Sequence, residues 1–369
     1  MNQEEAKLAI VEWINNGTNK YLILEGEPGT GKSHLIQEID LDISLLTRLT
    51  ATTHKAAKLL NGETIHSVLG LRVQEDWNTG TSRLVASGKK TIFPSNIVII
   101  DECSMINSDL WKFIDSSVNK FLLVGDSNQL PPVKDTFSIF DLDIPRIKLS
   151  VNYRQLSGST IPEVSKNIRP SKDVVFLDGE SYKDLLLEHY SNELDVATLA
   201  FTNQVVDQYN SLIRSHLETE KLLLGNPSGE FPSLNETIVF GSAFTFGKNT
   251  IPSQSIGRVH SVNGNEVTIY TDKYIATGIY LPYPERVKYL SRYKKTHTMP
   301  EYMQEKSRYL DIRSGYATTI HQSQGSTYNN VFLDLADVNT RCRDLDLKQR
   351  LVYVALTRAK DKVYVYNGD

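Results

Sequence analysis

The feature that most constrains this chain is the octapeptide GEPGTGKS at residues 26–33, which has the pattern G-x-x-x-x-G-K-S. A short apolar run at 21–24 precedes it, and the segment SHLIQEI that follows has the apolar spacing of a helix. In a strand, glycine loop and helix of this order, backbone N–H groups close around a phosphate and the helix N-terminus adds positive potential. The sequence therefore predicts a phosphate-binding loop in an α/β protein, and a chance glycine turn is the alternative.

Two polar residues of this loop suit phosphate chemistry, and two carboxylates follow another apolar strand. Lys32 would neutralise terminal phosphate charge, and the hydroxyl of Ser33 would bind Mg²⁺. The segment IVIIDE at 97–102 predicts that Asp101 holds the same Mg²⁺ and that Glu102 is the general base. An exposed acidic strand end is the alternative. The loop alone leaves kinases, GTPases, transporters and motors open.

The length of 369 residues exceeds what one hydrophobic core usually organises, so we expect at least two domains. Strands at 97–100 and 121–124, with helices between them, favour a parallel sheet. Residues 71–94 interrupt this rhythm with an Asn-Thr-Gly turn signal, which predicts an inserted hairpin.

A second α/β pattern begins at about residue 150, with strands at 196–201, 331–335 and 362–366 and a helix at 203–217. Residues 232–310 differ, because IGRVHSVNGNEVTIYT alternates in period two around Asn-Gly. This alternation predicts a hairpin in a small antiparallel barrel.

The charge balance places a condition on any polyanionic partner. The net charge is −4, so such a partner has to meet a local basic groove. Residues 286–295, RVKYLSRYKK, carry five basic residues, two tyrosines and no acid. This pattern suits single-stranded nucleic acid, and a solvated helix face is the alternative.

No segment predicts a membrane partner. The N-terminus lacks the pattern of a secretory signal, and no apolar run approaches the roughly 18 residues that span a bilayer. Only Cys103 and Cys342 are present, which fits free thiols in a reducing compartment. We expect a cytoplasmic protein.

Taken in chain order, nine segments resemble the motifs of superfamily 1 helicases, most closely the branch of RecD, Pif1 and phage Dda. They are GEPGTGKS at 26, ATTHKAA at 51, TIHS at 64, IIDECSM at 99, VGDSNQLPPV at 124, NYRQ at 152, AFTNQVVDQYN at 200, YATTIHQSQG at 316 and VYVALTRAK at 352.

The resemblance implies an α/β fold with two RecA-like P-loop NTPase domains. The first would span 1–148, with a β-hairpin insertion, the pin, at 71–94. The second would combine 149–231 with 311–369 and carry an SH3-like β insertion at 232–310.

The same resemblance implies ATP and Mg²⁺ as cofactors. Gln3 matches a glutamine that contacts adenine, and Gln129 matches a residue that senses the γ-phosphate and links it to the DNA path. Arg154 and Arg358 match arginines that stabilise transition-state charge when the domains close. The implied nucleotide contacts are Gln3, Glu27, Pro28, Gly29, Thr30, Gly31, Lys32, Ser33, His34 and Gly325. For Gln3 and Gln129 the alternatives are an exposed polar residue and a turn-forming residue.

Hydroxyl, amide and imidazole groups at matching positions imply contacts with phosphate and sugar that carry no sequence information. The implied DNA contacts are Thr52, Thr53, His54, Thr64, His66, Pro131, Asn203, Thr318, Thr319 and His321, with Trp77 and Phe93 stacking on a terminal base pair. Threonines at strand ends also cap helices, and Trp77 could equally be a core aromatic. Gln322 stands where many relatives have lysine, which implies weaker or less salt-dependent affinity for the strand.

The resemblance implies a monomeric DNA helicase that moves 5′ to 3′ on single-stranded DNA and opens duplex or fork DNA. Replication or single-strand-binding proteins are candidate partners, a phage or bacterial origin fits, and replication, recombination and repair stay open. The alternatives are a motor that works on RNA or displaces proteins, a nucleotide-gated binding module and a small-molecule phosphotransferase. The last has no use for AFTNQVVDQYN or YATTIHQSQG.

Overall fold

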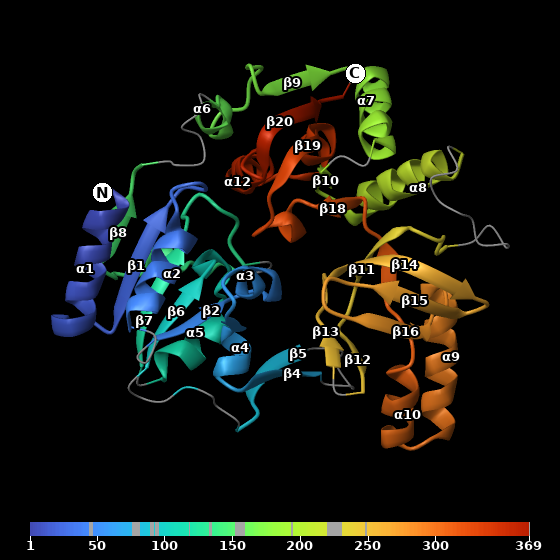
Figure 1. Ribbon diagram of the computed structural model, residues 1–369, viewed down its shortest axis with the longest axis horizontal. Coiled ribbons are helices and arrows are strands. Elements are labelled where there is room, and N and C mark those ends of the chain that lie inside the picture. The colour runs from blue at the N-terminus through green and yellow to red at the C-terminus, as the bar shows by residue number, and fades with distance from the viewer. Residues whose placement is uncertain are drawn as a thin grey trace. The chain divides into compact units, whose positions relative to one another are not determined.

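The computed structural model describes residues 1–43, 47–75, 82–88, 92, 96–117, 119–132, 135–151, 159–192, 195–219, 231–247 and 249–368. The chain forms two compact units (Figure 1). The first comprises residues 1–173, 325–327 and 344–360, and the second comprises 174–324, 328–343 and 361–369.

The described helices and strands of the first unit follow the expected strand and helix alternation. In chain order they are α1 Gln3–Asn16, β1 Tyr21–Gly26, α2 Lys32–Ile43, β2 Thr47–Ala51, α3 His54–Leu59, β3 Glu63–Thr64, α4 Ile65–Val68, β4 Leu71–Glu75, β5 Ser82–Ala86, β6 Ile97–Asp101, the 3₁₀ helix η1 Cys103–Met105, α5 Ser108–Asp115, β7 Lys120–Gly125, the 3₁₀ helix η2 Ile139–Asp141, β8 Arg146–Leu149, α6 Ile161–Ser165 and, from the end of the chain, α12 Leu345–Leu356.

Six of these strands form one parallel sheet in the order β3-β2-β6-β7-β1-β8. Its central strands β1, β6 and β7 are mainly apolar, with charged residues at or near their ends, because helices cover both faces. Along β1, Leu22 and Leu24 pack with α1 and α2, whereas Ile23 packs with α4 and α5 on the other face. The parallel register brings the carboxyl ends of β1, β6 and β7 to one edge, where the loops after these strands meet.

The region of the expected pin contains an antiparallel hairpin. Strands β4 and β5 pair from Leu71 opposite Ala86 to Glu75 opposite Ser82. Leu71 and Leu84 pack partly against the apolar cluster under α4 and α5. The base of the hairpin is therefore attached to the core of the first unit.

The second unit contains a second parallel arrangement and an antiparallel one. Its elements are β9 Val174–Leu177, α7 Gly179–Ser191, β10 Val196–Ala200, α8 Asn203–Thr219, β11 Thr237–Phe240, β12 Phe244–Phe246, β13 Asn249–Ile251, β14 Ile256–Asn263, β15 Glu266–Tyr270, β16 Ile275–Ile279, α9 Tyr283–Thr296, α10 Met299–Lys306, β17 Ile312–Ser314, β18 Ala317–Thr319, the 3₁₀ helix η3 His321–Ser323, β19 Tyr328–Asp334 and α11 Leu335–Arg341, followed by β20 Ala359–Tyr366, whose first two residues belong to the first unit.

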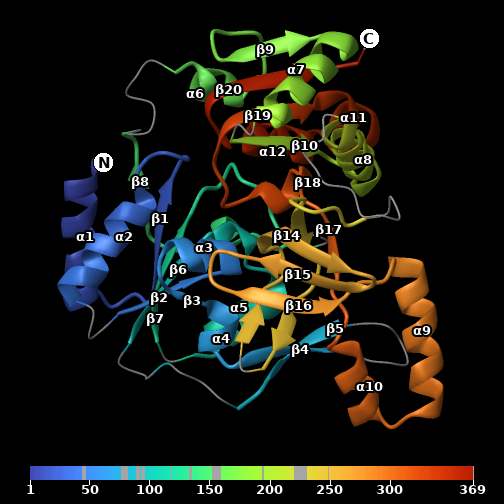
Figure 2. The same cartoon turned by 45° about the vertical axis from the view of Figure 1, so that its right-hand side comes forward.

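The parallel pairs of this unit lie in a sheet of order β18-β10-β19-β20-β9. Helices α7 and α8 cover one side of it through Tyr182, Leu186, Ile213 and Leu217, which pack on Phe332. A separate sheet of order β16-β15-β14-β11-β17 includes the expected Asn-Gly hairpin between β14 and β15 (Figure 2). It has its own apolar core, which includes Phe240, Val267 and Ile269.

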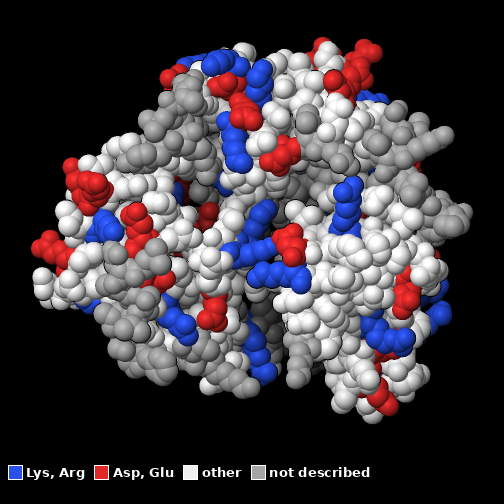
Figure 3. Space-filling model, in the orientation of Figure 1, with Lys and Arg blue, Asp and Glu red and all other residues white. Residues whose placement is uncertain are grey.

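The basic segment at 286–295 lies within α9, which packs beside α10 (Figures 1 and 2). Tyr289 donates a hydrogen bond to Glu305 of α10 at 3.0 Å, and Leu290 of α9 is buried. Lys288, Arg292 and Lys295 are exposed. The face drawn in Figure 3 carries both basic and acidic side chains.

Candidate functional site

The loop at 26–33 joins β1 to α2 in a conformation that requires glycine. Gly29 and Gly31 have φ values of 88° and 78°, in the left-handed region that side chains disfavour. A Cβ atom at Gly31 would lie 1.8 Å from Nε2 of Gln3. The Thr30 hydroxyl donates to the carbonyl of Glu27 at 2.8 Å and closes the turn. Successive backbone N–H groups in such a turn form an anion-binding concavity.

The side chains of Lys32 and Ser33 leave the first turn of α2 toward different partners. Lys32 Nζ donates to the backbone carbonyls of Gly26 and Glu27, so the ammonium is folded over the loop. Ser33 Oγ donates to Oδ2 of Asp101 at 3.3 Å. A hydroxyl beside a carboxylate fits Mg²⁺, which binds few protein oxygens and completes its shell with phosphate and water. Within the described ranges no three His, Cys, Asp or Glu side chains form an all-protein metal cage.

Asp101 and Glu102 end β6 at the same edge of the sheet. Asp101 is 7% exposed and accepts the N–H of Glu102 at 2.8 Å. Glu102 has a φ of 54°, an uncommon conformation for a residue with a side chain that occurs at functional sites. Burial raises the pKa of both carboxyl groups, and burial together with the charge of Asp101 raises the pKa of Glu102 to about 7.

These residues line a cavity of about 290 Å³ within the first unit. Its lining is Pro28, Gly29, Gly31, Lys32, Ser33, Ala56, Leu59, Asp101, Glu102, Gln129, Gly325, Thr327 and Arg358. Segments from opposite ends of the chain thus contribute to one site. The backbone of Gly325, φ 71°, brings it close to Glu102: a Cβ there would lie 3.9 Å from Oε1.

Four predicted nucleotide contacts, namely Gln3, Glu27, Thr30 and His34, lie outside the cavity lining. Gln3 donates to the carbonyl of Thr30 at 3.2 Å, so it lies directly behind the loop. Glu27 pairs with Lys166 at 2.6 Å. The His34 side chain is 67% exposed and lies 3.8 Å from Glu38, away from the lining.

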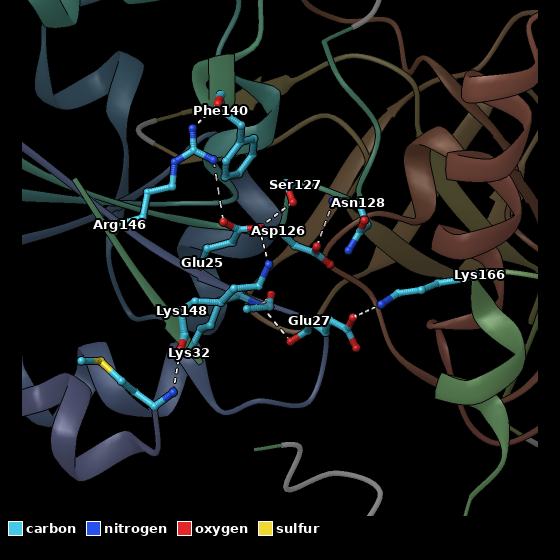
Figure 4. A network of polar contacts seen from close by, with 12 residues as sticks. Glu25, Glu27, Lys32, Asp126, Ser127, Asn128, Phe140, Arg146, Lys148 and Lys166 are labelled. Atoms are coloured by element: carbon cyan, nitrogen blue, oxygen red, sulfur yellow. Dashed lines mark hydrogen bonds and ion pairs between the residues drawn. The ribbon is translucent and has the colours of Figure 1, made fainter. Parts of the chain in front are cut away.

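Glu25, which sequence reasoning missed, ties the loop to the turn after β7 (Figure 4). It is 6% exposed and accepts the Ser127 hydroxyl at 2.5 Å. Its carboxylate also lies 3.6 Å from Lys148 and 3.9 Å from Arg146, both on β8. A carboxylate that ends an apolar strand one residue before a glycine loop was the available signal.

Sequence reasoning also missed the contacts of α12. Arg350 Nη1 donates to the carbonyls of Ser127, at 2.5 Å, and Gln129, at 3.0 Å. The Tyr353 hydroxyl donates to Oδ2 of Asp126 at 2.8 Å. Arg350 and Tyr353 are three residues apart on a helix whose segment 351–356 is otherwise apolar, a spacing that places both on one face.

Arg358 lies directly after α12 and is 4% exposed. Its guanidinium donates to the carbonyls of Val354, at 3.1 Å, and Ser326, at 3.2 Å. Lys55 donates to the hydroxyl of the same Ser326. Arg154, the other predicted arginine, lies outside the described residues, as do Trp77 and Phe93.

The predicted DNA contacts of the first unit include two helix caps. Thr53 caps α3 by accepting the N–H of Ala56, and Thr64 caps α4 by accepting that of Ser67. Thr52 donates to the carbonyl of Glu102 at 3.0 Å, which joins this segment to the cavity. Desolvation lowers the pKa of His54 and His66, so both imidazoles favour the neutral form. Pro131 lies half-buried, two residues after Gln129.

The predicted DNA contacts of the second unit gather near the end of β18. Thr318 donates to Oε1 of Gln322 at 3.2 Å, and Thr319 accepts the Gln322 N–H at 3.3 Å. Arg313 donates to the same Oε1 at 2.7 Å, so a guanidinium lies beside Gln322. Desolvation lowers the pKa of His321. Asn203 is exposed at the start of α8.

Across the described ranges, no helix is both long and apolar enough to cross a membrane. The two cysteines, Cys103 and Cys342, are buried and are not joined by a disulfide.

Comparison with known proteins finds matches to two family models and to several helicases. A sequence profile of an AAA domain matches residues 9–135, and a profile of the UvrD-like helicase C-terminal domain matches residues 314–366. The ATP-dependent RecD2 DNA helicase of Deinococcus radiodurans is 24% identical over 94% of this chain, which covers 47% of that protein. The ATP-dependent DNA helicase Dda of enterobacteria phage T4 is 23% identical, with 93% of this chain and 94% of Dda aligned.

Among solved structures, the Pif1 helicase from Bacteroides in complex with ADP-AlF3 and single-stranded DNA has a similar fold. The TM-score is 0.61 at 17% identity, over 99% of this chain and 92% of that one. The match confirms the prediction of an α/β protein with two RecA-like domains.

Proposed function

Since the chain belongs to the superfamily 1 helicases, in the branch that contains RecD, Pif1 and Dda, we propose that it is an ATP- and Mg²⁺-dependent DNA helicase. It moves 5′ to 3′ on single-stranded DNA and separates duplex or fork DNA as a monomer. The observation that carries the proposal is the cavity in which Lys32, Ser33, Asp101, Glu102, Gln129 and Arg358 meet.

The hydrolysis step follows from the chemistry of these residues. Lys32 and the backbone N–H groups of the loop hold the terminal phosphates. Ser33 and Asp101 would hold Mg²⁺, which would neutralise charge on the phosphate oxygens. Glu102 orients the attacking water and takes its proton as the water oxygen bonds to the γ-phosphorus and the bond from that phosphorus to the ADP oxygen breaks. Gln129 contacts the γ-phosphate. Arg358 stabilises charge on the transferred group with a guanidinium that burial and hydrogen bonds hold in place.

Two features support Glu102 as the base. Its left-handed backbone conformation is stabilised by the surrounding structure at the end of a buried strand. Burial also raises the pKa of Glu102, which makes its carboxylate a stronger proton acceptor than an exposed one.

The DNA contacts that we propose are non-specific contacts to phosphate and sugar at the ends of strands. Thr52 and His54 on the first unit are candidates because the Thr52 hydroxyl contacts the backbone of Glu102. A DNA strand bound to Thr52 would be linked to the hydrolysis site through Glu102 alone. On the second unit, Thr318 and Arg313 meet at Gln322 and offer a hydroxyl and a cation.

The domain limits are proposed together with the function. Residues 1–148 and the discontinuous 149–231 and 311–369 would form the two RecA-like domains. The hairpin of β4 and β5 would be the pin that separates strands, and the antiparallel sheet within 232–310 would be the SH3-like insertion.

The test is the steady-state ATPase rate without nucleic acid, with single-stranded DNA and with single-stranded RNA, all at the same low salt concentration. We expect large stimulation by DNA and none in Lys32→Ala, which loses the cation on the terminal phosphates. Stimulation by RNA alone would indicate an RNA-directed motor. Rapid turnover indifferent to both polymers, or normal turnover in the Lys32 variant, would contradict the proposal.

A further inference from the structure

Two side chains of α12 contact the turn at 126–129, and neither belongs to the cavity lining. We propose that Tyr353 and Arg350 are positioning residues for ATP hydrolysis. They attach this turn to α12 and thereby keep Gln129 and Arg358 at a fixed distance from each other in the cavity. The inference rests on the proposed function, because it concerns the rate of the same reaction.

The contact of Tyr353 with Asp126 is enclosed and specific. Tyr353 is 3% exposed and Asp126 is 1% exposed. One carboxylate oxygen of Asp126 accepts the Tyr353 hydroxyl at 2.8 Å, and the other accepts the N–H of Asn128 at 3.0 Å. The carboxylate is therefore bonded on one side to its own turn and on the other to α12. A buried hydrogen bond to a charged group is among the stronger kinds, because an unpartnered carboxylate in this setting is costly.

Arg350 holds the same turn through its backbone. Its guanidinium donates to the carbonyl of Gln129 at 3.0 Å and to that of Ser127 at 2.5 Å. Ser127 is in turn bonded to Glu25 at the start of the nucleotide loop (Figure 4). The hydrogen bond to the Gln129 backbone limits the positions that the Gln129 side chain can reach. The hydrogen bond to Ser127 fixes those positions relative to the loop that would hold the phosphates.

The other end of α12 carries the second group that lines the cavity. Arg358 follows the helix and lies five residues after Tyr353, about one and a half turns. A rigid helix transmits a shift at Tyr353 directly to Arg358. Tyr353 and Arg350 therefore set the separation of two groups that have to act on one γ-phosphate, and misplacement of either by about 1 Å is enough to slow such a reaction severely.

The packing of α12 does not depend on these polar contacts alone. Leu351, Val354 and Leu356 are fully buried, so the helix keeps an apolar attachment when a single hydroxyl is removed. A variant that lacks only the hydroxyl is expected to fold, and its defect is expected in catalysis more than in binding. This separates a positioning role from a general contribution to stability.

The experiment is Tyr353→Phe in the full chain, measured for kcat and KM of ATP with saturating single-stranded DNA, and for affinity toward a fluorescent ATP analogue. We expect kcat to fall about 10-fold or more, with KM and analogue affinity within about twofold of wild type, because the loop that binds the phosphates is unchanged. Arg350→Lys should give the same pattern, since the lysine side chain ends one bond short of Arg350 Nη1, the nitrogen that donates to both carbonyls.

Two controls match these variants. Asp346→Ala removes the exposed partner of Arg350, bonded at 2.7 Å, and leaves the carbonyl contacts in place, so kcat should stay within about twofold. Tyr190→Phe removes a buried hydroxyl that donates to the carbonyl of Tyr316 in the second unit. It should lower the melting temperature without lowering kcat.

Three outcomes would overturn the inference. Wild-type kcat in both Tyr353→Phe and Arg350→Lys would mean that the contacts do not position the reacting groups. An equal loss of kcat in Tyr190→Phe would mean that any loss of stability slows the enzyme. Absence of ATP turnover in the wild type would contradict both the proposed function and this inference. Normal turnover in the wild type and in both variants would contradict the inference alone.

Discussion

Replacing Glu102 by Gln separates the catalytic role of this carboxylate from its effect on stability. The substitution keeps the size of the side chain and removes its ability to accept a proton. General base catalysis contributes about 10²- to 10⁴-fold, so we expect the ATPase kcat to fall by that factor, which equals about 3–5 kcal/mol of activation free energy. Nucleotide affinity should be preserved, because Lys32 and the loop are unaffected.

The Glu102→Gln substitution should lower kcat but should raise the free energy of unfolding at neutral pH relative to wild type. Burial, followed by the charge of Asp101, raises the pKa of Glu102 to about 7, whereas in the unfolded chain it is about 4.3. Between these values the folded protein holds a proton that the unfolded chain releases, so the free energy of unfolding decreases as pH rises, by up to about 4 kcal/mol. Glutamine has no such proton. The Glu102→Gln variant should therefore gain stability relative to wild type as pH rises through this window.

The assay combines phosphate release at saturating ATP and DNA with thermal unfolding at about pH 5 and about pH 7.5, without nucleotide and with EDTA. Glu236→Gln is the matched control, because Glu236 is a buried carboxylate of the second unit, 3.3 Å from Arg214. It should lower stability and leave kcat unchanged. A Glu102→Gln variant with turnover within about threefold of wild type, or with equal losses of binding and turnover, would refute the reasoning.

Three further predictions follow from the same geometry. Arg358→Ala should spare nucleotide binding and reduce ATPase kcat about 10³-fold or more, measured by analogue titration and phosphate release, since the guanidinium acts on transition-state charge; equal losses in both would argue against this role. Gln322→Lys should strengthen binding to single-stranded DNA and steepen the salt dependence of the affinity by about one charge, measured by fluorescence anisotropy. Arg313→Ala should make this salt dependence shallower. An unchanged salt dependence in both variants would exclude contact with phosphate near Gln322. Chelation of Mg²⁺ should stop ATP turnover, and added Mg²⁺ should restore it. The apparent affinity for Mg²⁺ should be lower in Ser33→Ala than in wild type, because the Ser33 hydroxyl lies beside Asp101. Equal Mg²⁺ dependence in both proteins would contradict the role of Ser33 as a Mg²⁺ ligand.

The nucleotide loop could be predicted from the sequence because its determinants are local. The glycine pattern, the apolar run before it and the helix after it lie within one short segment, and φ values of 88° and 78° at Gly29 and Gly31 follow directly from the motif. Strands such as Ile97–Asp101 could also be predicted from the sequence, since an apolar run that ends in carboxylates is typical of a buried parallel strand.

The contacts of α12 were beyond the same reasoning. Asp126 and Tyr353 are separated by 227 residues, and no periodicity within either segment specifies the other as its partner. The left-handed conformation of Glu102 is likewise set by surrounding structure and carries no glycine to signal it. For Thr53 and Thr64, residue type allowed both a helix cap and a phosphate contact, and the structure contains the caps.

The most direct test of the account is strand separation on duplexes with a 5′ tail, a 3′ tail or blunt ends, under single-turnover conditions with wild type and Lys32→Ala. We predict ATP- and Mg²⁺-dependent separation of the 5′-tailed duplex by the wild type and none by the variant. Hydrolysis stimulated by DNA without separation of any of the three duplexes, or equal separation in both proteins, would contradict the claim that ATP hydrolysis in this cavity drives the opening of DNA.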